Sequence, residues 1–236
     1  MGNLYKTTAK RRSVVPQEVV GGRIRQSSMQ HILAAAERIF AQAGFGGATM
    51  AELAAAAGLP KANLHYYFGT KEKLYRALLE GILALWLDAA DCIVPERHPQ
   101  AALPAYIRAK LALSRDRPYA SKVFANEVLH GAPHLRSYLG LELRRRVDSK
   151  AVVIEGWIAR GWMDDVDPRH LLFILWAATQ TYADFETQIR AVLGVAALGA
   201  AEFAAAEEMV MRLVLKGCGV RPMASEAAQG ERICPS

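Results

Sequence analysis

Residues 49–74 constrain the fold more strongly than any other part of the chain. Their sequence, TMAELAAAAGLPKANLHYYFGTKEKL, predicts two short helices joined by a tight turn. Thr49, followed three residues later by Glu52, is a capping-box start signal, and Gly58 ends the first helix. A second short helix follows and ends at Gly69. Two short helices in this arrangement are typical of a helix-turn-helix unit.

Apolar residues recur at helical spacing along the rest of the chain, and no alternating run is long enough to predict a strand. Ser27 and Ser28 supply a start signal for a helix that ends at Gly44, and Thr70 caps a long fourth helix. Prolines and glycines separate the later segments. We therefore predict an all-α fold, with further helices at 101–115, 118–130, 134–160, 168–193 and 198–216.

The composition excludes several classes of protein. Of the 236 residues, 52% are hydrophobic, which is too apolar for a disordered chain. The longest apolar run, Leu171 to Ala178, is far shorter than a bilayer span, and no apolar segment of a secretory peptide follows the N-terminus. Cys92, Cys218 and Cys234 are too few and too scattered for a disulfide framework or a zinc site. We expect a reduced, soluble, cytoplasmic protein without a membrane partner.

Positive charge is concentrated at the N-terminus. Residues 1–25 contain six Lys and Arg residues and one Glu, so they carry most of the formal net charge of +6. A basic arm on a nearly neutral body suits contact with a polyanion, but a solvated terminus without a partner fits the same pattern. The sequence predicts a disordered arm at 1–25 and leaves both roles open. Residues 218–236, which lack periodicity, are expected to form a flexible tail.

The second short helix presents an unusual polar surface. Leu64 and Phe68 are four residues apart and should face inward. Cations, hydroxyls and planar side chains on the opposite face match what phosphates and base edges require. The residues expected on that face are Lys61, Ala62, His65 and Tyr66.

Three neighbouring residues have two interpretations each. Tyr67 can reach DNA or pack against the core, although packing is harder to maintain for two adjacent tyrosines. Thr49 can contact a phosphate or only cap its helix. Lys71 lies at the start of the next helix, where the helix N-terminus also attracts a phosphate.

The segment FAQAGFGGATMAELAAAAGLPKANLHYYFGTKEKL resembles the DNA-binding domain of the tetracycline-repressor (TetR) family of bacterial regulators. The resemblance implies a three-helix DNA-binding domain at 26–73, a larger helical domain for ligand binding and dimerisation at 74–217, and a homodimer on a palindromic double-stranded operator. Pro60 stands where the family commonly has a capping Ser or Thr, and His65 where tyrosine is frequent. Position by position, the DNA-facing roles fall on Thr49, Lys61, Ala62, His65, Tyr66, Tyr67 and Lys71.

The C-terminal half contains no recognisable catalytic or cofactor motif, so we expect neither enzymatic activity nor a cofactor. Glu127 and His130, with His134 nearby, are the nearest approach to a metal site. A Glu-x-x-His pair on one helix needs ligands from elsewhere. We therefore interpret these residues as a half-exposed polar face and predict no metal site.

Residues 168–193 carry the most informative pattern of this half. Trp176 and Gln180 are one helical turn apart, so an aromatic plane and a primary amide can meet one flat ring. A core glutamine satisfied by a neighbouring helix is the alternative interpretation.

The chain is further similar, over most of residues 27–216, to the pyrimidine-utilisation (Rut) repressor branch of this family. The segments that carry the similarity are LLEGILALWLDA, YIRAKLALSRDRPYASKVF, NEVLHGAPHL, IEGWIARG and DPRHLLFILWAATQTYADFETQI. This similarity implies uracil or a related pyrimidine as effector, in a pocket with Trp86, Trp176 and Gln180. Trp157 is instead expected in the core.

The resemblance also implies that 168–193 and 198–216 form a four-helix dimer interface. Together these observations favour a ligand-responsive repressor of pyrimidine catabolism. A regulator with a different aromatic or hydrophobic effector is the alternative within the family. A helical enzyme and a protein-interaction module are the alternatives outside it.

Overall fold

The computed structural model describes residues 17–223, with side chains from Arg25 onward. Every regular element in this range is helical, which confirms the all-α prediction. The first four helices are α1 (Gln17–Gly47), α2 (Met50–Ala56), α3 (Lys61–Phe68) and α4 (Lys71–Ala89). The remaining elements are η1 (Ala90–Cys92), α5 (Pro99–Asp116), α6 (Pro118–Leu129), α7 (Arg136–Tyr138), the π-helical turn η2 (Leu139–Leu143), α8 (Arg144–Ala159), α9 (Pro168–Asp184), α10 (Glu186–Leu193) and α11 (Ala200–Gly217).

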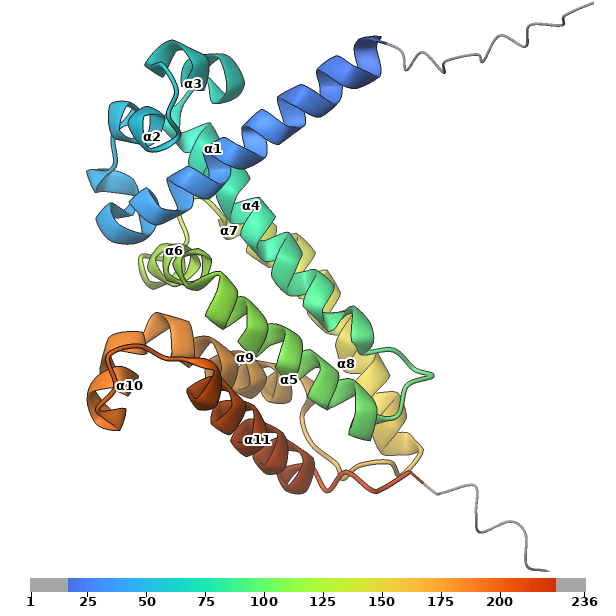
Figure 1. The fold of residues 1–236 in the computed structure, drawn as a ribbon. Helices are drawn as coiled ribbons and strands as arrows, with labels where there is room; N and C mark the ends of the chain where they lie inside the picture. Colours follow the sequence, from blue (N-terminus) through green and yellow to red (C-terminus); the bar gives the residue numbers. More distant parts are fainter. Residues whose placement is uncertain (1–16, 224–236) are drawn as a thin grey trace, which may run out of the picture.

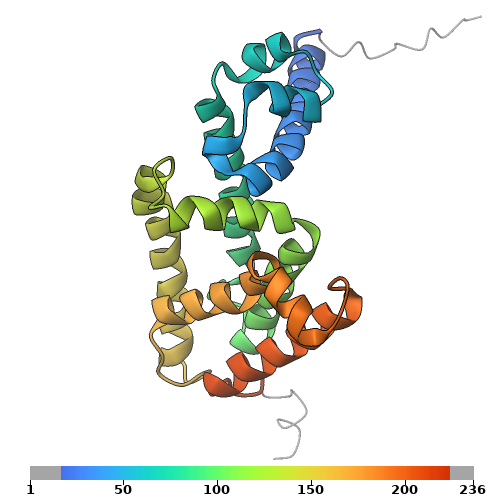
Figure 2. The ribbon, with the colours of Figure 1, turned by 90° about the vertical axis from the view of Figure 1, so that its left-hand side faces the viewer.

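The helices form two groups that α4 joins. Helices α1, α2 and α3 lie together at one end of the molecule, and α4 runs from them along the larger group (Figure 1). After a turn of about 90°, the same separation is visible, with α6 lying across the larger group directly below the first helices (Figure 2). A single straight helix therefore connects the two parts of the chain, and α6 lies between them.

Two hydrophobic cores correspond to this division. One contains the buried faces of α1 to α4 and extends into α6 through Ala120 and Val123. The other is built from α5, α8, α9 and α11, and Trp157 lies fully buried in it, as the sequence predicts. Because α6 contributes to the core of the first group, the small N-terminal unit does not pack independently of the larger one.

The structure corrects the expected N-terminal arm. Helix α1 begins at Gln17 rather than near Ser27, so the part of the predicted disordered arm from residue 17 onward is helical. The helix passes through Gly21 and Gly22, each of which costs about 1 kcal/mol relative to alanine. Residues 1–16 of the expected arm, and residues 224–236 of the expected tail, lie outside the described residues.

The predicted helix at 168–193 is in fact two helices. Helix α9 ends at Asp184, Phe185 leaves the helical conformation, and α10 follows. The predicted helix at 134–160 is present as α7, η2 and α8 in succession, with a π-helical turn inside it. The other predicted segments match α5, α6 and α11 to within two residues.

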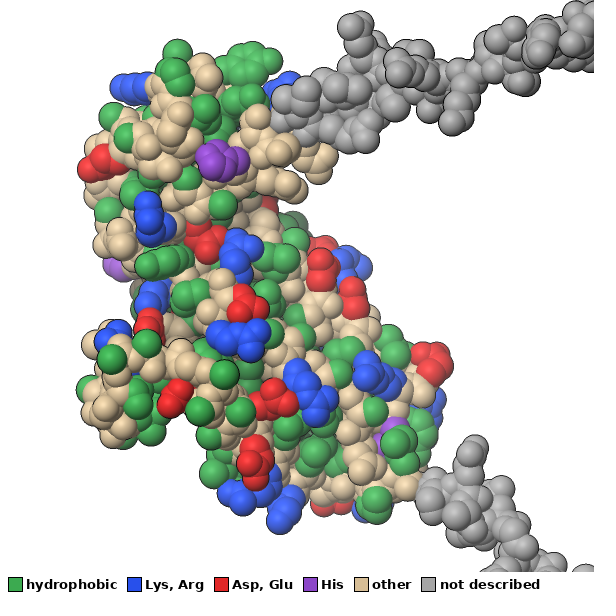
Figure 3. Space-filling view, in the orientation of Figure 1, with side chains coloured by type: hydrophobic (Ala, Val, Ile, Leu, Met, Phe, Trp, Pro, Cys, Tyr) green, Lys and Arg blue, Asp and Glu red, His purple; other side chains and the backbone are tan. Residues whose placement is uncertain are grey.

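None of the helices in residues 17–223 is long and apolar enough to cross a bilayer. Acidic and basic side chains are intermingled over the larger group of helices on the face shown in Figure 3. Cys92 and Cys218 are free thiols, and Cys234 lies outside the described residues.

Candidate nucleic-acid interface and small-molecule cavity

Helix α3 is held by its apolar side and leaves the other side free. Leu64 and Phe68 are buried, as their spacing predicts, and pack with Leu53 of α2 in the same core. The helix ends at Gly69, whose φ of 74° favours glycine. At its other end Pro60 makes no side-chain cap, which agrees with the loss expected from the sequence. Packing rather than capping therefore positions α3.

The outward face of α3 is the predicted one. Lys61, Ala62, His65 and Tyr66 are exposed, and Tyr66 is 71% exposed. Tyr67 is half-buried and meets the Tyr66 ring edge-on, with the ring centres 5.2 Å apart. This surface displays a cation, an imidazole and a phenol on one short helix, a combination suited to groove contacts.

His65 is held in a defined orientation. Its Nδ1 lies 2.8 Å from the carbonyl oxygen of Gly69. Because a carbonyl oxygen only accepts hydrogen bonds, Nδ1 carries the hydrogen, and Nε2 of the neutral ring remains an acceptor. The exposed edge of the imidazole can therefore accept a hydrogen bond from a base amino group.

Thr49 caps α2 through a complete capping box. Its Oγ1 accepts a hydrogen bond from the backbone N–H of Glu52 at 3.2 Å. The Glu52 carboxylate in turn accepts from the backbone N–H of Thr49 at 2.9 Å and from its hydroxyl at 2.8 Å. These bonds lower the pKa of the Glu52 carboxyl. The capping role of Thr49 is thus present in the structure, and its contact with phosphate remains a prediction.

Alanine at Thr49 is expected to lower the free energy of unfolding by about 1 kcal/mol, because the N-cap of α2 is lost. Urea unfolding followed by circular dichroism measures the change. Thr49→Ser retains the hydroxyl and serves as the control, with stability close to that of the parent protein. An unchanged unfolding midpoint in the alanine variant would contradict the capping role.

Lys71 has partners within the protein. Its Nζ donates hydrogen bonds to the carbonyl oxygens of Phe45 and Ala48, at 2.7 and 2.8 Å, and lies 4.5 Å from the centre of the Phe45 ring. Two of the three ammonium hydrogens therefore tie the start of α4 to the end of α1. One hydrogen is left for the predicted phosphate contact.

The second candidate site is a cavity of about 240 Å³ inside the larger group of helices. Trp86 of α4 and Trp176 and Gln180 of α9, which the sequence predicts at one pocket, all line it. The rest of the wall is mostly apolar and comes from α4, η1, α5, α6, η2, α8 and α9. The apolar side chains include Leu83, Leu87, Ala90, Phe124, Val128, Leu139, Leu143, Val147 and Leu172.

Polar groups from α5 complete the wall. The Trp176 indole N–H donates to the Tyr106 hydroxyl at 2.8 Å, which leaves the phenolic hydrogen for another acceptor. The Nζ of Lys110 lies 4.3 Å from the centre of the Trp86 ring. Burial raises the pKa of Tyr106 and lowers the pKa of Lys110 to about 7, although Asp184 opposes the latter shift.

Sequence reasoning missed Tyr106 and Lys110, although a signal was available. Tyr106, Ile107, Lys110 and Leu111 follow the spacing of one helical stripe, and all four are buried. A lysine within an apolar stripe indicates a buried ammonium, which is rare without a function or a partner.

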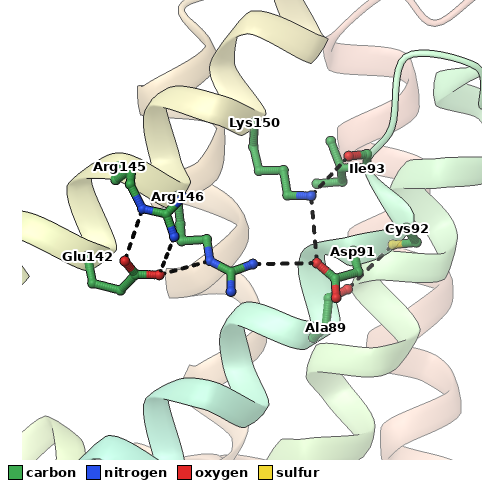
Figure 4. A network of polar contacts seen from close by, with 8 residues as sticks. All are labelled: Ala89, Asp91, Cys92, Ile93, Glu142, Arg145, Arg146 and Lys150. Carbon is green, nitrogen blue, oxygen red and sulfur yellow. Dashed lines mark hydrogen bonds and ion pairs between the residues drawn. The ribbon is translucent and has the colours of Figure 1, made fainter.

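Two further cations on the cavity wall are paired. The guanidinium of Arg146 donates to Glu142 at 3.1 Å and lies 3.9 Å from an Asp91 oxygen. Lys150 lies 3.8 Å from the same oxygen of Asp91 and donates to the carbonyl of Ile93 at 3.2 Å. Figure 4 shows this network between α8 and η1. Both cations therefore have acidic partners.

The Glu127 region differs from the expected half-exposed polar face. Glu127 is only 4% exposed, and its carboxylate accepts from the backbone N–H of His134 at 2.6 Å and lies 3.1 Å from Nδ1 of that residue. It also raises the pKa of Tyr75, together with burial, which is the larger cause. His130 is exposed and instead contacts the Asn126 carbonyl. Among the described residues, no group of three His, Cys, Asp or Glu side chains could hold a metal.

Two family models match the chain. Residues 32–78 match the model described as "Bacterial regulatory proteins, tetR family", and residues 79–221 match "YcdC-like protein, C-terminal region". The boundary between the matches lies within α4, the helix that joins the two groups. The sequence therefore agrees with the two-part arrangement of the fold.

Curated relatives cover nearly the whole chain. The HTH-type transcriptional regulator RutR of Escherichia coli is 40% identical over 217 residues, which is 92% of this chain and 97% of that protein. The HTH-type transcriptional repressor NicS of Pseudomonas putida is 30% identical over 159 residues, covering 61% of this chain and 70% of that protein.

Solved structures share the fold at low sequence identity. The ketosteroid transcriptional regulator KstR2 of Mycobacterium tuberculosis has a TM-score of 0.65 and 19% identity, with 82% of this chain and 95% of that chain covered. The structure of AibR in complex with isovaleryl coenzyme A and operator DNA has a TM-score of 0.62 and 19% identity, with 79% and 97% covered.

Proposed function

Because this chain belongs to the tetracycline-repressor family of bacterial transcriptional regulators, a non-enzymatic family, we propose that it is a repressor whose operator affinity is controlled by a pyrimidine such as uracil. In this proposal a homodimer binds a palindromic operator through the outward face of α3. The pyrimidine occupies the cavity lined by Trp86, Trp176 and Gln180. The proposed target of regulation is pyrimidine catabolism.

The single observation that supports a pyrimidine effector is that these three side chains line one small cavity. A volume of about 240 Å³ is below the roughly 300–1,000 Å³ of pockets for drug-sized ligands, so it suits a single small ring. The Gln180 amide can donate and accept at once, which matches the neighbouring N–H and C=O of a uracil edge. The 40% identity to RutR of Escherichia coli supports the same class of regulator.

The proposed dimer is supported by apolar side chains exposed on two helices. Phe173 and Ile174 of α9, and Met209 and Leu213 of α11, are each more than 40% exposed. Large apolar groups of this kind are typical of surfaces that another subunit covers. In a dimer with two α3 helices about 34–36 Å apart, both helices enter successive major grooves of one duplex.

An operator selected from a random-sequence pool tests this function by mobility shift, with and without uracil and thymine. We expect uracil to change operator affinity about 5- to 150-fold, which corresponds to a coupling of about 1–3 kcal/mol between the two sites. Reciprocity requires the operator to change uracil affinity by the same factor.

Gln180→Leu provides the matched control, because it retains the size of the side chain and removes the amide. This variant should bind the operator normally and lose the response to uracil. If no pyrimidine changes operator affinity, the effector proposal is wrong while DNA binding stands. If no sequence is selected from the pool, the proposed function fails as a whole.

A further inference from the structure

Lys110 is a buried cation without a counter-ion. Lys110 is 2% exposed and lines the cavity from α5. The contact of its ammonium is with the face of Trp86, at 4.3 Å from the ring centre. Among the described residues, no carboxylate lies within ion-pair distance of Lys110, and no hydrogen bond to its Nζ is formed. A buried ammonium without such partners is costly unless something else satisfies it.

The acidic groups near the cavity have other partners. Asp184 of α9 influences Lys110 electrostatically, but its carboxylate accepts a hydrogen bond from Ser121. Asp91 and Glu142 lie against Arg146 and Lys150 (Figure 4). None of the described residues that line the cavity is acidic. Its polar groups therefore offer more hydrogen-bond donors than acceptors.

We propose that Lys110 selects the cavity's ligand by donating to a ring carbonyl oxygen, so that the effector is a small planar molecule rich in carbonyl acceptors rather than in amino groups. This inference rests on the proposed function and deepens it. The Gln180 amide would hydrogen-bond to a neighbouring N–H and C=O on one edge of the ring. The Lys110 ammonium would donate to a carbonyl oxygen elsewhere on the ring. The Lys110 ammonium already covers one face of the Trp86 ring. In this proposal Trp86 therefore holds the ammonium in place and does not stack on the ligand with that face.

The consequence is discrimination between uracil and cytosine. Cytosine carries an amino group where uracil carries a carbonyl. At that position cytosine would place a hydrogen-bond donor against the Lys110 ammonium, which is itself only a donor. A site built for a hydrogen bond from a buried charged group rejects a ligand that leaves the group unpaired. We expect the wild-type protein at pH 6 to bind uracil roughly ten- to hundredfold more tightly than cytosine.

The same arrangement predicts a pH dependence with a defined sign. Desolvation lowers the pKa of Lys110 in the free protein to about 7, and a carbonyl ligand favours the charged form. Uracil binding should then take up a proton, and its affinity should fall as the pH rises above about 7. The other charged or titratable groups on the cavity wall are Tyr106 of α5 and Arg146 and Lys150 of α8, while α4 contributes the uncharged Trp86. Asp184 of α9 acts on Lys110 electrostatically, and Lys122 of α6 acts in turn on Asp184.

Isothermal titration of uracil and cytosine into the full-length protein between pH 6 and 8 tests the inference. Lys110→Met retains the aliphatic length and removes the charge. It should lose about tenfold or more in uracil affinity, most of the preference over cytosine, and the pH dependence. Arg108→Met removes an exposed cation from the same helix and should bind as the wild type does. Lys110→Gln is a second variant, and thermal melting verifies that each is folded.

The outcomes separate the two proposals. Uracil binding that is equally tight, selective and pH-dependent in Lys110→Met would overturn the role of Lys110 and leave the pyrimidine effector standing. A wild-type protein that binds its operator but no pyrimidine would overturn the effector itself, and this inference with it.

Discussion

Alanine at Tyr66 is expected to weaken operator binding by about 5- to 150-fold and to leave the fold intact. Each lost base contact costs about 1–3 kcal/mol, and Tyr66 is the most exposed of the large hydrophobic side chains on α3. Among the residues whose side chains the structure describes, its ring contacts are with the edge of Tyr67 and the guanidinium of Arg25. Little folding energy therefore depends on it. Mobility shift on the selected operator and on a scrambled duplex measures the effect.

Two further variants sharpen this result. Tyr119→Ala removes a partly exposed tyrosine on α6 and should leave operator affinity unchanged. Lys61→Ala should weaken binding to all DNA sequences alike. The slope of log affinity against log salt concentration should become shallower by about the amount that one phosphate contact contributes. Unchanged operator affinity in the Tyr66 variant would show that another surface reads the DNA.

The outward face of α3 could be predicted because its information is local. The four-residue spacing of Leu64 and Phe68 fixes which side is buried, so the residues on the opposite side of the helix face outward. The same local logic placed Trp176 and Gln180 on one side of α9, where both reach the cavity. Helical periodicity within one segment is sufficient for conclusions of this kind.

Two features that the sequence did not predict, the burial of Glu127 and the helix break at Phe185, depend on contacts between distant segments. Glu127 is buried because His134 and Tyr75 approach it from outside its own helix. The helix break at Phe185 has no proline or glycine, and it follows directly after Asp184, which bonds to Ser121 of α6. Local patterns contain no record of such partners, so a polar residue on an amphipathic helix is naturally interpreted as exposed.

Alanine at Arg117 is expected to disrupt the connection between the two groups of helices. Arg117 lies between α5 and α6, and its guanidinium forms an ion pair with Glu37 of α1, including a hydrogen bond of 3.3 Å from Nε. Glu37 is only 5% exposed. The variant leaves this carboxylate buried without a cation, which should lower the free energy of unfolding by about 1–3 kcal/mol. Urea unfolding measures the loss.

The same variant should also weaken the response of DNA binding to the effector. Helix α6 contributes Phe124 and Val128 to the cavity wall. On its other side α6 approaches α1 so closely that a Cβ at Gly44 would lie 3.3 Å from the amide nitrogen of Asn126. A rigid helix in contact with both sites can transmit a change from one to the other only while both contacts hold. We therefore expect uracil to alter operator affinity less in Arg117→Ala than in the wild type.

Arg115→Ala is the matched control for both effects. Arg115 lies two residues earlier and pairs with Asp116 at the surface, where both side chains are at least half-exposed. A surface ion pair of this kind contributes about 0–1 kcal/mol, so stability and the uracil response should change little. If Arg117→Ala is destabilised but retains the full response to uracil, the joint between α1 and α6 stabilises the fold without carrying the coupling, which must then pass along α4 from Trp86.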